Sequence, residues 1–390
     1  MKLSSMLVAA GTVVAAASLS TVGIASAGTP SATPSATGKH ALHACGAPGK
    51  GYATCFAQTM VSDNGAKPNA SSPSGLNPAD IQSAYKLSGS STATVAIVDA
   101  YDDPNAEADL GVYRSQFGLP ACTTANGCFR KTSQTGSSKL PRANANWAVE
   151  ISLDLDMVSA ACPTCHILLV EASSNSFANL AAAVNYAATQ GVAAISNSYG
   201  GSDSAETSQY NHPGIAITAS SGDNGYGIES PASYPHVIGV GGTSLTRASN
   251  TRGWNETAWS GAGSGCSTLN AKPAWQTSVT QCSGDAVADV SAVADPNTGV
   301  SVYDSTSYQG IVNWSVWGGT SAASPIIAAV YAASGNTAGY PASYTWSHAT
   351  GLFDVTTGSN GTCSPSIWCH AGTGWDGPTG LGTPNGTSAF

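Results

Sequence analysis

Charged side chains are scarce in this sequence of 390 residues: Asp, Glu, Lys and Arg together make up 9% of it, against roughly 25% in an average soluble protein. Positive charge is the scarcer sign, with 13 Lys and Arg against 22 Asp and Glu and a net charge of −9. We therefore expect no nucleic-acid partner. A sparsely charged surface also gains little self-repulsion when its carboxylates are protonated, which is compatible with work in acid.

Long apolar runs are missing after the first residues. Lys2, an apolar stretch over residues 6–24 and then Ala25-Ser26-Ala27 are typical of a secretory signal peptide, which we assign to residues 1–27. No later run approaches the ~20 residues that a membrane-spanning helix needs. We expect a secreted, extracellular monomer that makes no membrane contact once the signal is removed.

Residues 28–75 are expected to form a linker and a short N-terminal segment, because residues 28–38 repeat Thr-Pro-Ser-Ala, a composition typical of disordered linkers. We find no motif to interpret in residues 40–75. Residues 76–390 contain no linker, and short apolar runs alternate there with helical patterns. This alternation predicts one α/β domain, a mostly parallel central sheet with helices on both faces. The expected strands are 95–99, 167–170, 192–196, 215–220 and 237–240, and the expected helices are 104–117, 147–161 and 177–189.

The ten cysteines fall in five close pairs. In an exported chain this spacing suggests five short-loop disulfides, although the connectivity does not follow from the sequence. One pair, in Cys162-Pro-Thr-Cys165-His166, also matches the attachment signature of c-type haem. Against a haem protein stand the apolar strand that follows at once and a lack of methionines other than Met60 and Met157 after the signal. The pairs are Cys45/Cys55, Cys122/Cys128, Cys162/Cys165, Cys266/Cys282 and Cys363/Cys369.

A candidate nucleophile stands in Gly318-Gly319-Thr320-Ser321, which precedes a small apolar run over residues 326–333. The glycines permit a sharp turn and the run predicts a buried helix, so Ser321 is expected at a helix N-terminus. Free N–H groups and the helix dipole favour negative charge there, which suits a serine oxygen that attacks a carbonyl. The alternative is a capping Thr-Ser pair in a turn of small residues.

Two carboxylates, Glu150 and Asp154, lie one turn apart on one face of the helix expected at 147–161. No Lys or Arg accompanies them, and like charges at this spacing destabilise a helix, so stability alone does not explain the pair. If both face a cleft, at least one pKa is raised and the pair is suited to acid–base work in acid. A solvated acidic stripe is the alternative.

Asp223 follows the strand expected at 215–220, in Ser221-Gly222-Asp223-Asn224-Gly225. Catalytic groups in α/β sheets gather at the carboxyl ends of the strands, so Asp223 is a third candidate for the same site. Turn chemistry explains the segment equally well, because Gly-Asp-Asn-Gly is an ordinary turn sequence.

Together these stretches resemble the sedolisin family, the serine-carboxyl peptidases, whose catalytic domain is subtilisin-like. The resemblance covers roughly residues 76–390. The family's nucleophile motif matches Gly319-Thr320-Ser321 with Pro325, its Glu-x-x-x-Asp pair matches Glu150 and Asp154, and its Ser-Gly-Asp segment matches 221–223. Further similar stretches are 230–235, 240–244, 256–260 and 289–292.

The resemblance implies a serine-type endopeptidase or tripeptidyl-peptidase that hydrolyses proteins or peptides at acidic pH, in a window of roughly pH 3 to 5. Ser321 would attack the scissile carbonyl, Glu150 would take its proton and return it to the leaving amine, and Asp154 would hold Glu150. Asp223 would donate a hydrogen bond to the oxyanion, which a carboxyl does only while it keeps its proton.

The resemblance also implies a Ca²⁺ site near the C-terminus, where Asp354-Val355 and Gly372-Thr-Gly374-Trp-Asp376 match the family's site. The ligands would be the two carboxylates and the main-chain carbonyls of Val355, Gly372 and Gly374, which are the hard oxygen donors that calcium takes. Without the resemblance these residues suggest only a glycine-rich loop.

Family members usually begin with a large folded prosegment, and the about 45 residues between the expected signal and the matching domain are too few for one. Two other functions stay open. A subtilisin-type Asp-His-Ser triad could take its aspartate from Asp99, but none of the seven histidines lies in a glycine-flanked helix start. A catalytically silent binding protein on a peptidase scaffold would normally lack a catalytic residue, whereas all four candidates are present.

Overall fold

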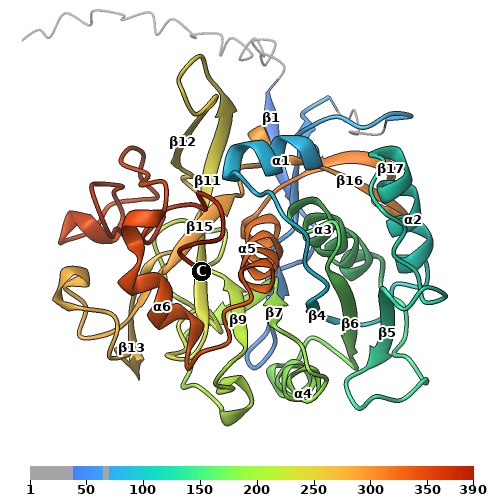
Figure 1. The fold of residues 1–390 in the computed structure, drawn as a ribbon, viewed down its shortest axis with the longest axis horizontal. Coiled ribbons are helices and arrows are strands. Elements are labelled where there is room, and N and C mark those ends of the chain that lie inside the picture. The colour runs from blue at the N-terminus through green and yellow to red at the C-terminus, as the bar shows by residue number, and fades with distance from the viewer. Residues whose placement is uncertain (1–37, 65–69) are drawn as a thin grey trace, which may run out of the picture. The chain divides into compact units, whose positions relative to one another are not determined.

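An eight-stranded sheet forms the centre of the domain (Figure 1) in the computed structural model, which describes residues 38–64 and 70–390. The strand order is β12–β11–β9–β7–β4–β6–β5, with β15 paired to β11 off this path. Every pairing is parallel except that of β12 with β11, which confirms the mostly parallel sheet. The strands are β4 (Thr94–Ala100), β5 (Phe129–Ser133), β6 (His166–Ala172), β7 (Ala194–Asn197), β9 (Ala216–Ser220), β11 (Ile238–Arg247), β12 (Trp254–Ala258) and β15 (Val290–Val293).

Helices cover both faces of this sheet, as predicted. Helices α3 and α5 pack against each other on one face, and α4 packs against β4, β6 and β7 on the other (Figure 1). The three helices expected at 104–117, 147–161 and 177–189 are found with their ends within two residues of the prediction. The helices are α1 (Pro78–Tyr85), α2 (Ala106–Gln116), α3 (Ala145–Ala161), α4 (Phe177–Ala188), α5 (Thr320–Ser334) and α6 (Pro341–Ser347).

Helix α3 is buried on every side. The Asn144 side chain caps its N-terminus, and every residue from Trp147 to Ala161 is buried. The helix lies between the sheet and the antiparallel pair β16 (Val300–Tyr308) and β17 (Ile311–Trp317). A helix covered on all sides takes any carboxylate that it carries out of water, and this position decides the chemistry of Glu150 and Asp154.

The N-terminal segment, to which the sequence assigns no role, is part of the same compact unit as residues 76–390. Its strands are β1 (Lys39–His43), β2 (Thr54–Cys55) and β3 (Gln58–Ser62). Strand β1 pairs antiparallel with β3, and β2 pairs antiparallel with β8 (Tyr199–Ser202). The remaining strands are β10 (Glu229–Ser230), which also pairs with β8, and the antiparallel pair β13 (Gly265–Ala271) and β14 (Gly284–Val287).

All five predicted cysteine pairs form disulfides. The pair in the haem-like motif, Cys162 and Cys165, is buried and bonded to itself just before β6. Because both sulfur atoms are used in this bond, neither is free to form a thioether to a porphyrin. The haem interpretation of the motif is therefore wrong for this structure.

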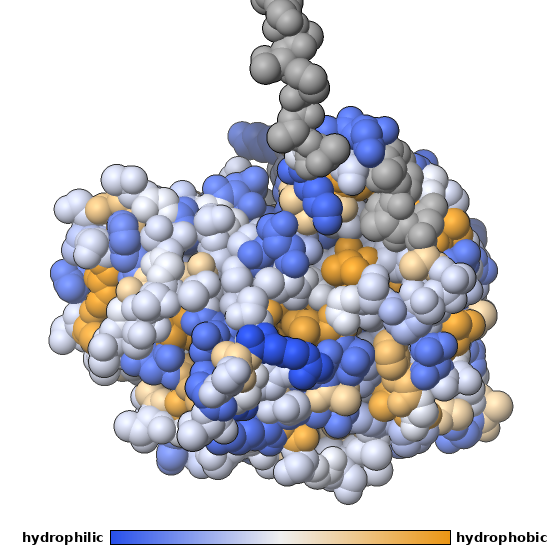
Figure 2. All heavy atoms as spheres, turned by 90° about the horizontal axis from the view of Figure 1, so that it is seen from above, coloured by the Kyte–Doolittle hydropathy of each residue, from blue (hydrophilic) through white to orange (hydrophobic). Residues whose placement is uncertain are grey.

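The surface reflects the low charge of the chain. In Figure 2, which views the molecule from above Figure 1, pale residues of intermediate hydropathy cover much of the face, and apolar residues form separate small patches. No helix in the described part of the chain combines the length and the apolar character needed to cross a membrane. The expected signal peptide, residues 1–27, lies outside the described residues.

Candidate active site

Ser321 is the second residue of α5, where the sequence places it. The helix begins after Gly319, whose φ of 94° is a conformation that glycine adopts freely. A Cβ on Gly319 would lie 2.6 Å from Asp223 Oδ2, so the turn also needs a residue without a side chain. The Ser321 hydroxyl donates to the main-chain carbonyl of Ser198 at 3.3 Å, a long hydrogen bond.

Pro325 has a structural reason for its place inside α5. It has no N–H to donate to the carbonyl of Ser321 four residues earlier, so that carbonyl is left without its helical partner. The Ser198 hydroxyl oxygen lies 3.3 Å from this carbonyl oxygen, and its single proton makes the shorter hydrogen bond, to Asp154. Ser198 follows the end of β7, and both its side chain and its main chain therefore contact the residue at the start of α5.

Glu150 and Asp154 face the same point from α3, and neither is exposed at all. Glu150 Oε2 accepts a hydrogen bond from the main-chain N–H of Ala57 at 2.7 Å. Asp154 Oδ1 accepts one from the Ser198 hydroxyl at 2.8 Å. Because both carboxyls are fully buried, the alternative of a solvated acidic stripe is wrong.

Burial dominates the electrostatics of these acids. It raises the pKa of Glu150 well above its usual range, the charge of Asp99 raises it further, and the Ser321 hydroxyl and the Ala57 N–H partly oppose the rise. The pKa of Asp154 is raised by burial, by Asp99 and by Glu150. The raised pKa makes the ionised form of Glu150 a stronger base, so a proton taken from Ser321 can be held on it.

Asp99 is a third buried carboxyl of this group that the sequence did not assign to it. It lies near the end of β4, and burial raises its pKa to about 8. Neither of its oxygens accepts a hydrogen bond within the described residues. The sequence singled it out only as a partner for a histidine. Asp99 lies beside Glu150 and Asp154 because of the way α3 crosses the sheet. A local sequence pattern does not predict this crossing.

Asp223 reaches the site from the other side, after β9, as predicted. Its Oδ1 accepts hydrogen bonds from the N–H and the hydroxyl of Thr320 at 2.8 and 2.7 Å. Its Oδ2 accepts one from Gln58 Nε2 at 2.6 Å. Burial raises the pKa of Asp223 to about 7 against the opposing effect of these hydrogen bonds. At acidic pH this carboxyl is neutral and can itself donate.

The fold thus gathers the predicted residues Glu150, Asp154, Asp223 and Ser321 around the start of α5. No histidine in the described residues hydrogen-bonds to Ser321 or to these acids, so the subtilisin-type triad has no base here. The sequence missed Ala57 and Gln58, which contact the site from the N-terminal segment. A main-chain N–H leaves no trace in a sequence pattern, and a lone glutamine in a short strand has no distinguishing signal.

The loops expected to bind calcium lie together near the C-terminus. Gly374 N–H donates to Asp354 Oδ2 and Gly372 N–H donates to Asp376 Oδ2, each at 3.0 Å. Burial raises the pKa of Asp376 to about 7, and the charge of Asp354 raises it further. Neither carboxylate forms an ion pair with a side chain of the described residues. Neighbouring carboxylates without a counter-charge fit a cation, and carboxylate oxygen is a donor that calcium takes.

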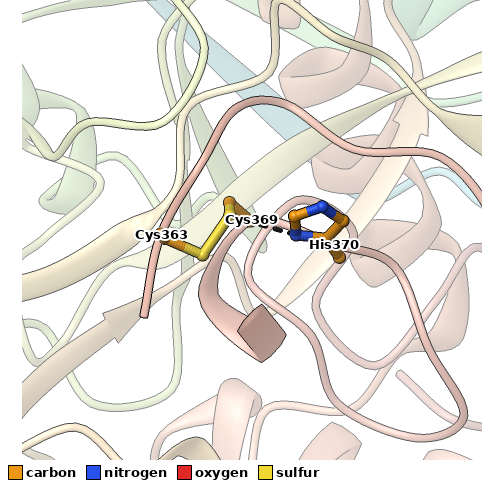
Figure 3. A group of neighbouring side chains, drawn as sticks. All are labelled: Cys363, Cys369 and His370. Atoms are coloured by element: carbon orange, nitrogen blue, oxygen red, sulfur yellow. Dashed lines mark hydrogen bonds between the residues drawn. A yellow bond between two sulfur atoms is a disulfide. The ribbon is translucent and has the colours of Figure 1, made fainter. Parts of the chain in front are cut away.

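A second group with metal-ligating side chains is not a metal site. Cys363, Cys369 and His370 lie together in the C-terminal part of the chain (Figure 3). The two sulfur atoms form a disulfide, and His370 Nδ1 lies 3.2 Å from Cys369 Sγ. A disulfide sulfur offers no thiolate to a metal, so a single imidazole remains.

The comparisons with known proteins agree with this geometry. A model of the subtilase family matches residues 137–361. Sedolisin from Pseudomonas sp. (strain 101) is 29% identical over 368 residues, which cover 80% of this chain and 60% of sedolisin. Kumamolisin from Bacillus sp. (strain MN-32) is 27% identical over 371 residues, which cover 82% of this chain and 64% of kumamolisin. The chain therefore matches less than two thirds of the length of these relatives.

A solved structure supports the same assignment. Pseudomonas sedolisin, a serine-carboxyl proteinase complexed with two molecules of pseudo-iodotyrostatin, superposes with a TM-score of 0.67 at 27% identity, over 80% of this chain and 96% of that one. The subtilisin-like α/β fold expected from the sequence is thereby confirmed. Because the family model covers more than half of the chain, the chain belongs to the subtilase family, and it is similar in sequence and fold to sedolisin.

Proposed function

We propose that this chain is a secreted peptidase that cuts protein or peptide substrates at acidic pH with Ser321 as its nucleophile. The observation that carries the proposal is the position of Ser321 at the start of α5, beside a carboxyl that is fully buried and partnered by a second buried carboxyl. A serine becomes reactive when a neighbouring base takes its proton, and Glu150 is the base within reach.

The steps follow from the positions of these groups. Ser321 Oγ attacks the scissile carbonyl while its proton passes to Glu150, which then gives this proton to the leaving amine. Asp154 accepts a hydrogen bond from the Ser198 hydroxyl on one oxygen, and burial, Asp99 and Glu150 raise its pKa. Asp154 lies one helical turn from Glu150 and acts on the reaction by holding that base in place.

Asp223 supplies the hydrogen bond that stabilises the oxyanion. Thr320 occupies Oδ1, so the proton of the neutral carboxyl belongs on Oδ2, which points toward Gly319. A fixed donor at this point acts where negative charge develops and is worth several kcal/mol in other enzymes. This role ends when Asp223 ionises, and its pKa of about 7 sets the upper limit of the working pH.

Calcium has a structural part in the proposal. Asp354 and Asp376, with the main-chain carbonyls of Val355, Gly372 and Gly374, would hold the ion, and its charge would offset the repulsion between the two carboxylates. The loop adjoins the catalytic sheet, because Trp375 Nε1 donates to the Ala288 carbonyl at 2.8 Å, just before β15.

The test is digestion of an unfolded protein by the purified full chain at several pH values, with the fragments sequenced. The proposal expects fragments in acid that wild type produces and Ser321→Ala does not. The positions of the cuts would separate internal cleavage from removal of N-terminal tripeptides. If wild type releases no fragments at any pH from 3 to 7, the chain is a silent scaffold and the proposal is wrong.

A further inference from the structure

The N-terminal segment runs along one side of the active site as an added strand. Strand β2 pairs antiparallel with β8, with Thr54 opposite Gly200. The same pairing extends beyond the end of β2 to Phe56, whose N–H donates to the carbonyl of Ser198 at 3.4 Å. The same carbonyl accepts the Ser321 hydroxyl. Phe56 therefore lies opposite the residue that contacts the nucleophile.

The segment is also hydrogen-bonded on the other side of Ser321, beyond Phe56. Gln58 N–H donates to the Gly318 carbonyl at 3.1 Å, and Gly318 N–H donates to the Gln58 carbonyl at 2.8 Å. The Thr59 hydroxyl donates to the Val316 carbonyl at 2.6 Å. One extended stretch is thus held by main-chain hydrogen bonds before and after the nucleophile, which is how a peptide substrate adds a strand to an enzyme.

Between these two paired stretches lies the peptide bond that joins Phe56 to Ala57. Its N–H donates to Glu150 Oε2 at 2.7 Å. Its carbonyl oxygen lies against Gly319, on the side where a Cβ would also meet Asp223 Oδ2. The nitrogen therefore contacts the proposed general acid, and the oxygen faces the proposed oxyanion donor. A scissile bond needs both relationships at once.

We propose that the Phe56–Ala57 bond is the first substrate of the enzyme, bound in the cleft by the chain's own fold and cut there by Ser321. This inference rests on the proposed function. Until the cut, β2 and β3 occupy the sites on both sides of Ser321 that an external peptide would need. The segment thereby blocks the cleft to an external peptide.

The chemistry balances with water as the only co-reactant. Ser321 Oγ forms a bond to the Phe56 carbonyl carbon, and its proton passes to Glu150. The carbon–nitrogen bond to Ala57 then breaks, and Glu150 gives that proton to the new amine. Water attacks the acyl group, its proton passes to Glu150 and on to the leaving Ser321 oxygen, and Phe56 is left with a free carboxyl. A cavity of about 400 Å³ that Phe56 and Asp223 help to line gives the water space.

The disulfide between Cys45 and Cys55 shapes the part that would leave. Both cysteines lie on the acyl side of the bond, so no covalent link holds the released piece to the enzyme. The disulfide joins two cysteines that are ten residues apart, and the second of them directly precedes Phe56. It limits the conformations of residues 45–55 before the cut. After the cut, hydrogen bonds still hold the piece, among them the β1–β3 and β2–β8 pairings and the contacts of Ala53 with Asn175, and its loss frees the acyl side of the cleft.

The experiment follows the N-terminus and the external activity of the same samples. The full chain is purified at a pH above 7, moved to pH 4 at protein concentrations that differ 100-fold, and sampled for intact mass, N-terminal sequencing and hydrolysis of an unfolded protein. We expect a new N-terminus at Ala57, formed at a rate that does not depend on protein concentration. Ser321→Ala should keep Phe56 and Ala57 joined.

A matched pair of variants tests the contact with Glu150. Ala57→Pro removes the N–H that Glu150 accepts and should leave the bond uncut, whereas Ala57→Gly keeps the N–H and should be cut. Thermal unfolding checks that both variants fold. If Ala57→Pro does not fold, the comparison of wild type with Ser321→Ala still decides.

Three results would overturn the inference and leave the proposed function standing. In the first, wild type digests external protein while its own Phe56–Ala57 bond stays intact. The second is cleavage at Ala57 in Ser321→Ala as well, and the third is a rate that rises with protein concentration. A chain that cuts neither itself nor external protein would overturn the inference and the proposed function together.

Discussion

Gln58 donates a hydrogen bond from its side-chain amide to Asp223 Oδ2 at 2.6 Å. The preceding residue, Ala57, donates its main-chain N–H to Glu150 Oε2 at 2.7 Å. Two adjacent residues of the N-terminal segment therefore contact the proposed base and the proposed oxyanion donor. A cut between Phe56 and Ala57 turns Ala57 into a free N-terminus next to both acids, so processing changes the surroundings of the catalytic carboxyls.

Ser321→Ala and Glu150→Gln should each lower kcat on a peptide substrate by about 10⁴-fold or more, because members of one catalytic unit fail together. The matched control is Ser334→Ala at the other end of α5, where the hydroxyl donates to the Tyr331 carbonyl and accepts from the Asn336 N–H. Steady-state kinetics at pH 4 measure the effect. Near wild-type turnover in either of the first two variants would show that the site is assigned wrongly.

The Phe56 ring indicates which substrates fit the cleft. It lies against Gly200, where an added Cβ would come within 2.8 Å of the ring. Wild type should therefore prefer peptides with Phe on the acyl side of the cut bond, and Gly200→Ala should lower kcat/KM for them by about 10- to 200-fold.

A peptide with Ala at that position is the control, since its side chain does not reach Gly200. A matched pair of peptides, assayed with both enzymes, gives the comparison. An equal loss for the two peptides would show that Phe56 does not report the binding site of the substrate side chain.

The sequence predicts much of this site because the residues involved carry local signals. Ser321 follows paired glycines and precedes an apolar helix, Glu150 and Asp154 are spaced by one turn, and Asp223 follows a strand. Each signal is a spacing within a single element, and the structure keeps it. The turn that holds Ser321 is equally local, because Pro325 sits four residues on.

The remaining contacts cross large sequence distances and have no such signal. Ala57 meets Glu150 through its main chain, and Asp99 meets the acid pair only because α3 crosses β4. The pairing of β2 with β8 depends on a neighbour more than a hundred residues away. A two-residue strand has no periodicity to read, so the role of the N-terminal segment is visible only in the folded chain.

Calcium removal should lower the thermal stability of the protein, because an ion bound only by the native state stabilises it by mass action. Calorimetry in metal-free buffer, with and without added calcium, should show a higher Tm with the ion. Asp376→Asn should have a lower Tm that no longer responds to calcium. Equal melting of wild type in both buffers would count against the site.

Stability should be greater at pH 4 than at pH 8. Burial raises the pKa of Asp99 to about 8, of Asp304 to about 8 and of Glu171 to about 9. The folded state thus binds more protons than the unfolded chain between roughly pH 4 and these values, so stability falls as pH rises.

The measurement is Tm at fixed free calcium from pH 4 to pH 8. Asp304→Asn serves as a control, since it removes one titrating group and keeps an oxygen for the Thr306 N–H. Its loss of Tm over this range should be smaller than that of wild type. A Tm that rises steadily from pH 4 to pH 8 would contradict the account.

The pH profile of kcat/KM tests the carboxyl mechanism most directly, because it reports the essential acid and base of the free enzyme. We measure it from about pH 2.5 to 9 for wild type and for Asp223→Asn, whose amide keeps an oxygen for Thr320 and donates at every pH. Wild type should be most active in acid and lose activity as pH rises through about 7, where Asp223 ionises. Asp223→Asn should be slower but should not show this loss. A wild-type plateau at roughly pH 7 to 9 with loss below about 6 would instead show a histidine base and contradict the account.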